Sequence, residues 1–166
     1  MRVASQTQTS GREHFDVFIC YNSADEEQVA AIVETLRRRG ISPWFDKWEL
    51  RPGLPWQGAL EERIRSIGSA AIFVGKSGIG PWQYEELTAY MRQFIKRGCP
   101  VIPVILDGCP RTPELPVFLE GRTWVDFRSD RTDPLSYLIW GITGTKPEWP
   151  ATQSPQSREP EKRQEG

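Results

Sequence analysis

The sequence predicts an α/β domain in which a five-stranded parallel sheet, in the flavodoxin-like order 2-1-3-4-5, carries helices on both faces. Apolar runs typical of strands alternate along the chain with amphipathic stretches typical of helices. The central runs are apolar throughout, as expected for strands that are buried on both faces. Right-handed crossovers between such strands favour this strand order.

The first expected strand covers residues 15–20, and a helix is predicted to follow from Ser23. Ser23 and Glu26 have capping-box spacing, which places acidic side chains in the positively polarised first turn. Apolar residues then recur at helical spacing until Gly40 ends the helix after three arginines. A short second strand over 41–45 contains Pro43, which predicts a place at the edge of the sheet.

The connection after the second strand, residues 46–57 (DKWELRPGLPWQ), is predicted to be a long loop. Connections in α/β units usually take about two to six residues, and longer ones are commonly functional. The remaining elements are expected in this order: a helix over 57–67, a strand over 70–74, a helix over 82–97, a strand over 101–106, a strand over 123–127 and a helix over 134–142.

Length and composition predict one domain with polar ends. Of the 166 residues we expect 14–146 to fold, whereas the polar segments 1–13 and 147–166 are expected to be disordered. The net charge of −1, from 21 basic and 22 acidic side chains, provides no basic surface for nucleic acid. No apolar run has the length of a membrane span or of a signal peptide, which favours a cytoplasmic protein.

The cysteine and histidine content argues against disulfides and metals. Three cysteines (Cys20, Cys99 and Cys109) without framework spacing favour a reducing compartment. The only histidine, His14, stands beside the polar N-terminus, and no Cys or His pair has zinc-ligand spacing. We therefore predict no metal site.

The expected strand order reverses between strands 15–20 and 70–74, so a ligand crevice is predicted beyond their carboxyl ends. The segments at that place are 20–23 (CYNS) and 75–78 (GKSG), with the loop 46–57 beside them. The glycine-rich stretch 76–80 (KSGIG) resembles a phosphate-binding loop only superficially, because it lacks the full spacing of one.

One carboxylate on the helix 82–97 is a candidate for chemistry. The core-facing stripe of this helix consists of apolar residues at helical spacing: Leu87, Tyr90, Met91 and Phe94. At about 100° per residue, Glu85 falls opposite that stripe, whereas Glu86 falls on its flank with Trp82. A carboxylate between aromatic side chains at a crevice can be catalytic, although a flank glutamate taken alone is more often a surface residue.

Four segments, in order and at the right spacing, resemble a TIR domain over about residues 14–143. FDVFICYNSADEEQ resembles its first strand and following turn, and WFDKWELRPGLPWQ resembles its BB loop. SAAIFVGKSGIGPWQYEEL resembles the third strand and the helix with a Trp-x-x-x-Glu-Leu motif, and VIPVIL the fourth strand.

The resemblance implies a catalytic role for Glu86, because the glutamate four residues after that tryptophan is catalytic in NAD-cleaving TIR domains. It further implies a set of substrate-binding residues: Phe18, Tyr21, Asn22, Ser23, Trp48, Leu50, Trp56, Lys76 and Trp82. Two departures from the family pattern suggest different phosphate contacts, since Cys20 replaces the usual serine and Asn22 an arginine found in many relatives.

The implied activity is that of an NAD glycohydrolase or cyclase in immune or defence signalling, such as antiphage defence. NAD would be its substrate, with no separate cofactor. Self-association through the BB loop would activate it, and a sensor protein or fused domain is a possible partner. The alternative is a non-catalytic TIR adaptor, although adaptors usually lack the helix glutamate. Nucleoside deoxyribosyltransferases and hydrolases share the fold type. The BB loop and the Trp-x-x-x-Glu-Leu spacing of this sequence make them a distant match.

Overall fold

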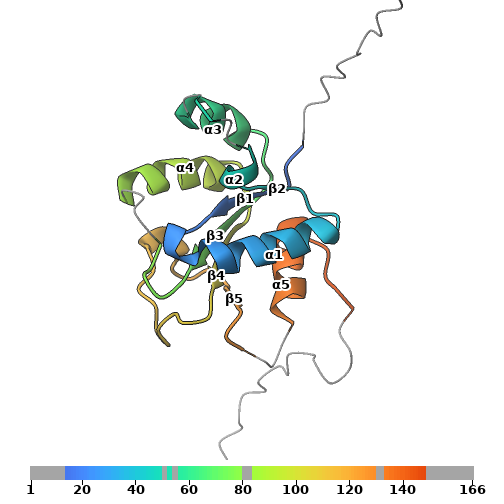
Figure 1. Ribbon diagram of the computed structural model, residues 1–166, viewed down its shortest axis with the longest axis vertical. Coiled ribbons are helices and arrows are strands. Elements are labelled where there is room, and N and C mark those ends of the chain that lie inside the picture. Colours follow the sequence, from blue (N-terminus) through green and yellow to red (C-terminus); the bar gives the residue numbers. More distant parts are fainter. Residues whose placement is uncertain (1–13, 50–51, 54–55, 80–83, 130–132, 149–166) are drawn as a thin grey trace, which may run out of the picture.

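The part of the chain that the computed structural model describes consists of residues 14–49, 52–53, 56–79, 84–129 and 133–148. Within it, the backbone alone is described at 47–48, 56–59 and 84–86. The described chain forms a five-stranded parallel sheet in the order β2-β1-β3-β4-β5 (Figure 1). The predicted fold class is therefore confirmed.

All five strands lie within the predicted segments, and they are short. Their bounds are β1 (Val17–Cys20), β2 (Pro43–Trp44), β3 (Ala70–Val74), β4 (Val101–Ile105) and β5 (Val125–Asp126). Among the described strands β2 pairs with β1 alone, so it is the edge strand that Pro43 predicts.

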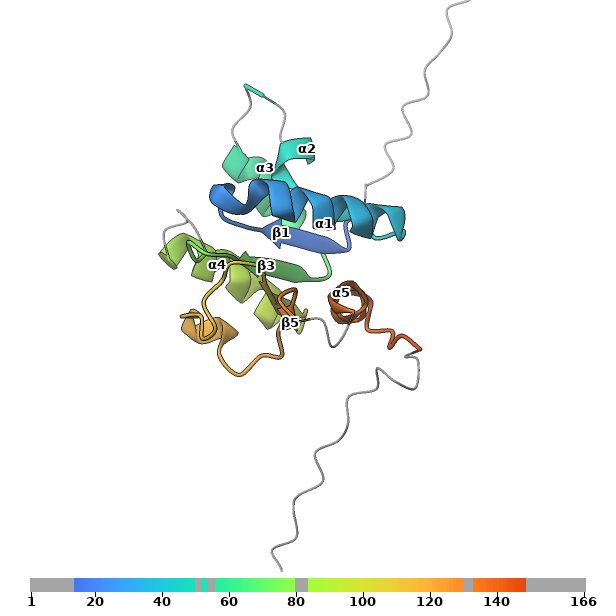
Figure 2. The same cartoon turned by 60° about the horizontal axis from the view of Figure 1, so that its bottom comes forward.

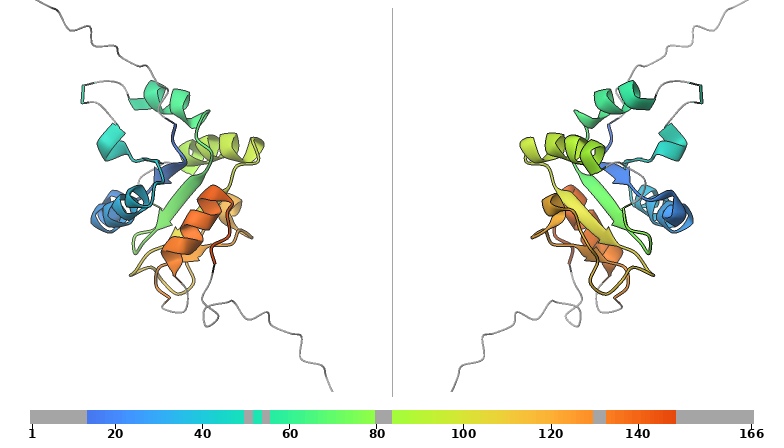
Figure 3. Two further views of the ribbon diagram at one scale, coloured as in Figure 1. Left: turned by 90° about the vertical axis from the view of Figure 1, so that its right-hand side faces the viewer. Right: turned by 90° about the vertical axis from the view of Figure 1, so that its left-hand side faces the viewer.

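Helices cover both faces of the sheet. On one face lie α1 (Glu26–Arg38) and α5 (Pro134–Thr143), and on the other lie α3 (Trp56–Ile64) and α4 (Tyr84–Lys96). Figures 2 and 3 show α1 and α4 on opposite sides of β1 and β3. Along β1, Val17 packs with the α1 cluster and Phe18 with the α3 and α4 cluster, so both faces of the strand are apolar.

The helix predicted from Ser23 begins later and has another cap. The Asn22 side chain accepts a hydrogen bond of 3.0 Å from the backbone nitrogen of Ala24, and a short 3-10 turn, η1 (Ser23–Asp25), leads into α1 at Glu26. Ser23 is exposed and is not the cap. An asparagine oxygen readily accepts from the backbone two residues ahead, which explains why it replaces the serine here.

The segment predicted as a continuous loop opens with a helix, α2 (Asp46–Glu49). The sequence DKWE contains no glycine or proline, and the turn at Pro52 and Gly53 comes only after it. Gly53 has φ +86°, a conformation that glycine adopts without steric cost. The first four residues of the predicted loop 46–57 are therefore helical.

Side chains rather than neighbouring strands set several element ends. Asp16 Oδ2 accepts the backbone N–H of Ser42 at 2.7 Å, so β2 starts at Pro43 and not at residue 41. Asp126 Oδ1 accepts the N–H of Arg128 at 2.9 Å and ends β5. Arg97 donates to the carbonyls of Ile64 and Ile67, at 2.7 and 2.8 Å, where α3 stops short of its predicted end.

Candidate functional site

The turns after β1 and β3 meet where the strand order reverses. We call these residues, 20–25 and 75–79, the switch point. The chain leaves β1 toward α1 on one face and leaves β3 toward α4 on the other. A Cβ placed on Gly75 would lie 2.3 Å from both carboxyl oxygens of Asp25, so the two turns touch through this side chain. The switch point of a parallel sheet is where such folds bind ligands.

Asp25 has an unusual environment for a carboxyl group. It occupies the N-cap position of α1, yet its side chain makes no capping hydrogen bond. Its Oδ2 is buried and has no hydrogen-bond partner among the described residues. Burial therefore raises the pKa of Asp25 above its ordinary value of 3.8.

Replacing Asp25 by asparagine should stabilise the protein at neutral and higher pH. A raised pKa in the folded state means that the protonated carboxyl favours folding below pH 3.8, and that this contribution is lost as the pH rises through the folded-state pKa. We expect Asp25→Asn to melt roughly 2–4 °C higher at pH 8, because the amide has no charge to desolvate and a gain of about 1 kcal/mol shifts the melting temperature by this amount in a chain of this size. The gain should vanish near pH 3 in a melting series, and a constant difference at every pH would contradict the assignment.

A hydrogen bond ties the switch point to the segment after β2. Tyr21 is buried, and its hydroxyl donates to Oδ1 of Asp46, the first residue of α2, at 2.7 Å. Burial raises the pKa of Tyr21, and the bond to Asp46 raises it further, so the hydroxyl remains a donor at neutral pH. Tyr21 therefore anchors the start of the segment 46–57 to the carboxyl end of β1.

Loss of this anchor should loosen the segment without unfolding the sheet. We expect Tyr21→Phe to increase tryptic cleavage after Lys47 several-fold, with a loss of only about 1 kcal/mol in stability, typical of one hydrogen bond. Asp46→Asn keeps an acceptor oxygen and should behave like the wild type, whereas Asp46→Ala should behave like Tyr21→Phe. Equal cleavage in all four proteins would show that the bond anchors nothing.

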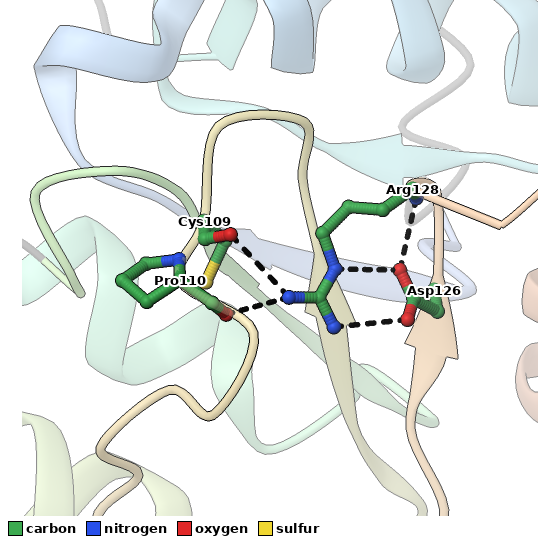
Figure 4. Close-up of polar contacts among 4 residues, drawn as sticks. All are labelled: Cys109, Pro110, Asp126 and Arg128. Atoms are coloured by element: carbon green, nitrogen blue, oxygen red, sulfur yellow. Dashed lines mark hydrogen bonds and ion pairs between the residues drawn. The ribbon is translucent and has the colours of Figure 1, made fainter.

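The carboxyl end of β5 carries a closed ion pair (Figure 4). Arg128 Nε and Nη2 donate to the two carboxylate oxygens of Asp126 at 2.9 and 3.0 Å. Arg128 Nη1 donates to the carbonyl oxygens of Pro110 at 2.5 Å and Cys109 at 3.4 Å. The hydrogen bond from Arg128 is the main reason that the pKa of Asp126 is lowered. Four of the five N–H groups of this guanidinium are engaged, and they hold the loop after β4 against β5.

A hollow of about 560 Å³ lies away from the switch point. Its lining includes His14, which precedes β1, and Ile41 and Ser42, which precede β2. The hollow therefore opens at the amino ends of these strands, opposite to the switch point. His14 thus lies far from the turns after β1 and β3. Within the described ranges no group of His, Cys, Asp and Glu could hold a metal ion. No described helix has the length and apolarity to cross a membrane.

Comparison with known proteins places the chain in a family. The model of the family described as "TIR domain" matches residues 17–139, which is most of the chain. The chain belongs to the TIR domain family. A search of curated proteins finds no match to this TIR domain.

Solved structures of other TIR proteins share the fold. The TIR domain of the Toll-related receptor TRR-2 from Hydra magnipapillata is 23% identical, with 75% of this chain and 94% of that domain covered and a TM-score of 0.56. A metazoan TIR-STING receptor from C. gigas, in complex with 2′,3′-cGAMP, is 21% identical over 78% of this chain and 40% of the receptor, with a TM-score of 0.59. At these identities the likeness shows the fold alone.

The predicted pocket residues of this TIR domain occupy different environments. Phe18 is 2% exposed, and its ring stacks on Trp44 and Phe94 at centroid distances of 5.3 and 6.1 Å. It is a core residue in this structure, and its contact with substrate stays a prediction. Asn22 is buried and caps η1, whereas Ser23 and Lys76 are exposed.

Cys20, which replaces the usual serine of TIR domains, lies in the core. It is 1% exposed, and burial raises the pKa of its thiol to about 12, with a smaller contribution from Asp46. The thiol therefore stays protonated and points to no chemistry.

The remaining predicted residues are placed by backbone or lie outside the described residues. Trp48 belongs to α2, Trp56 is the first residue of α3, and Glu86 belongs to the first turn of α4. Leu50 and Trp82 lie outside the described residues. Of the predicted substrate-binding residues, four lie together at the switch point: Tyr21, Asn22 and Ser23 after β1, and Lys76 after β3.

Sequence reasoning missed Asp25 and Asp46 as members of the site. In the sequence Asp25 is one of several acidic residues near the start of a helix. Only its contact with Gly75, far away along the chain, distinguishes it. Asp46 stands directly after the second strand and could have been suspected from that position, but its partner Tyr21 is revealed by the packing of β1 against β2.

Proposed function

We propose that this TIR domain cleaves the bond between nicotinamide and ribose in NAD, with Glu86 as the catalytic residue. The products would be nicotinamide and either ADP-ribose or a cyclic ADP-ribose, and the setting would be immune or defence signalling. NAD is the substrate in this proposal, and no further cofactor takes part.

The placement of α4 is the observation that supports the proposal most. The helix starts shortly after the turn that leaves β3 at the switch point, and Glu86 lies in its first turn. Burial fixes the rotation of α4, because Leu87, Met91 and Phe94 face the core while Arg92 and Lys96 are exposed.

Helical periodicity then separates the two neighbouring glutamates. Position 85 falls on the same side as the exposed Arg92 and Lys96, at about 100° per residue. Position 86 falls on the flank, in line with Tyr90 and Gln93, which are half-buried. A flank position in the first turn of a helix at the switch point is suited to a group that acts on a bound ligand.

The chemistry of the bond needs few catalytic groups. Nicotinamide leaves as a neutral molecule from a cationic substrate, so no general acid is required. The transition state resembles an oxocarbenium ion at the ribose, and a carboxylate close to the ribose hydroxyls stabilises that charge. One glutamate at a site without histidine is sufficient for this mechanism.

Self-association belongs to the same proposal. The segment 46–57 carries Trp48, Leu50, Leu54 and Trp56, a large apolar content for a connection of this length. We propose that this BB loop contacts a neighbouring copy and that the assembly is the active form. A head-to-tail contact of this kind builds open filaments.

The test is release of nicotinamide from NAD by the purified chain, measured by chromatography over a range of protein concentrations and with a crowding agent. Nicotinamide should appear together with ADP-ribose or a cyclic product. Absence of release at the highest concentration, from protein shown to be assembled, would exclude the NAD-cleaving activity and favour the adaptor function.

A further inference from the structure

The carboxyl of Asp25 lies where the carboxyl ends of β1 and β3 diverge. It fills the space that a side chain at position 75 would need, since a Cβ there would lie 2.3 Å from each of its oxygens. Gly75 is not among the glycines with positive φ, so glycine is required there for room and not for backbone conformation. The room is occupied by a carboxyl group that caps no helix.

The charge of this carboxyl is not balanced by a described side chain. At the carboxyl end of β5, Asp126 receives two hydrogen bonds from the guanidinium of Arg128 (Figure 4). That guanidinium also binds two backbone carbonyls, so four of its five N–H groups are engaged with partners other than Asp25. Lys76, next to Gly75, is exposed, and it forms no ion pair with a described residue.

The environment also limits how strongly water can screen Asp25. Its Oδ2 is buried without a hydrogen bond from any described residue. Burial is the main reason that the pKa of the Cys109 thiol after β4 is raised, and the negative charge of Asp25 makes a smaller contribution in the same direction. A partly desolvated carboxyl acts on a nearby charge more strongly than an exposed one does. A positive charge arriving at the switch point would offset the cost of burying this group.

We infer that Asp25 is a specificity-determining residue that makes the switch point selective for a positively charged ligand group, namely the oxidised nicotinamide ring of NAD. This inference rests on the proposed function, which supplies a ligand with such a ring. The oxidised ring carries a positive charge that the dihydronicotinamide of NADH lacks, and the rest of the two molecules is the same. Asp25 would therefore favour NAD over NADH without taking part in bond cleavage.

The experiment compares the dissociation constants of NAD and NADH for each protein, with NADH fluorescence as the direct readout and NAD as the competitor. We expect the wild type to prefer NAD by about five- to tenfold and Asp25→Asn to lose most of that preference. Glu27→Gln is the matched control, because it removes one negative charge from an exposed position on the adjacent helix and should keep the wild-type ratio. Since each ratio compares two ligands on one variant, a fraction of unfolded protein cancels from it.

A second variant tests the position of the charge. Gly75→Ala keeps Asp25 but introduces a methyl group into the space that the carboxyl occupies, and it should also lower the preference for NAD. An unchanged ratio in Asp25→Asn, with NAD still bound and cleaved, would overturn the role of Asp25 alone. A wild type that neither binds nor cleaves NAD would overturn the proposed function and this inference with it.

Discussion

Glu86→Ala is expected to abolish nicotinamide release from NAD, by at least about a hundredfold, whereas Glu85→Ala should retain most of the activity. Both glutamates lie in the first turn of α4, so the two substitutions are matched in residue type and in helix position. They differ in rotation about the helix axis, because position 85 shares the exposed side with Arg92 and position 86 shares the half-buried flank with Tyr90.

Initial rates of nicotinamide release at saturating NAD, together with melting temperatures, are the measurements. Because Leu87 and Met91 hold α4 in place from the core side, neither glutamate variant should lose its fold. Equal loss of activity in both variants, at unchanged melting temperature, would disprove the catalytic assignment of Glu86. Glu86→Gln is informative as well, since it keeps the size of the side chain and removes the charge that the mechanism requires.

Gly53→Pro should lower the specific activity of the assembled protein by roughly ten- to a hundredfold, because small displacements of the groups that position a substrate reduce the rate by about this factor. Gly53 has φ +86°, whereas the proline ring fixes φ near −65°. The substitution therefore forces the turn of the BB loop into another conformation. A Cβ at this position has no neighbour within 4 Å in the described chain, so the effect comes from the backbone and not from a clash.

The measurement is specific activity against protein concentration, with and without a crowding agent. Wild-type activity should rise steeply with concentration as the chain assembles, whereas Gly53→Pro should stay low throughout. Gly53→Ala should be intermediate, because an alanine at positive φ is strained but accessible. Constant wild-type specific activity from dilute protein upward, or a proline variant that matches it, would rule out assembly through this loop.

The sequence by itself determined the architecture of this protein. Apolar runs such as 70–74 and 101–106 are local signals, and burial on both faces follows from their composition. Pro43 placed β2 at the edge of the sheet, because a proline cannot donate a ladder hydrogen bond. The rotation of α4 was equally predictable. Of the predicted core-facing stripe, Leu87, Met91 and Phe94 are buried, whereas Tyr90 at its margin is half-buried.

The ends of helices and strands were predicted less accurately where side chains compete for backbone hydrogen bonds. Asn22, not Ser23, caps the turn after β1, and Asp16 takes the N–H of Ser42 that the predicted second strand would use. Sequence patterns indicate that such polar residues stand near element ends, but they do not decide which of them is the acceptor. The predicted helix and strand ends therefore shifted by a few residues.

Only the tertiary structure decided which groups face one another at the switch point. Asp25 meets Gly75, and Tyr21 meets Asp46, because parallel strands bring the turns at their carboxyl ends to one edge of the sheet. The topology predicts that these turns are neighbours, but the pairing depends on side-chain rotamers and on room at the contact. A local pattern carries no information on either. The buried Oδ2 of Asp25, which has no hydrogen-bond partner among the described residues, therefore emerged from the packing alone.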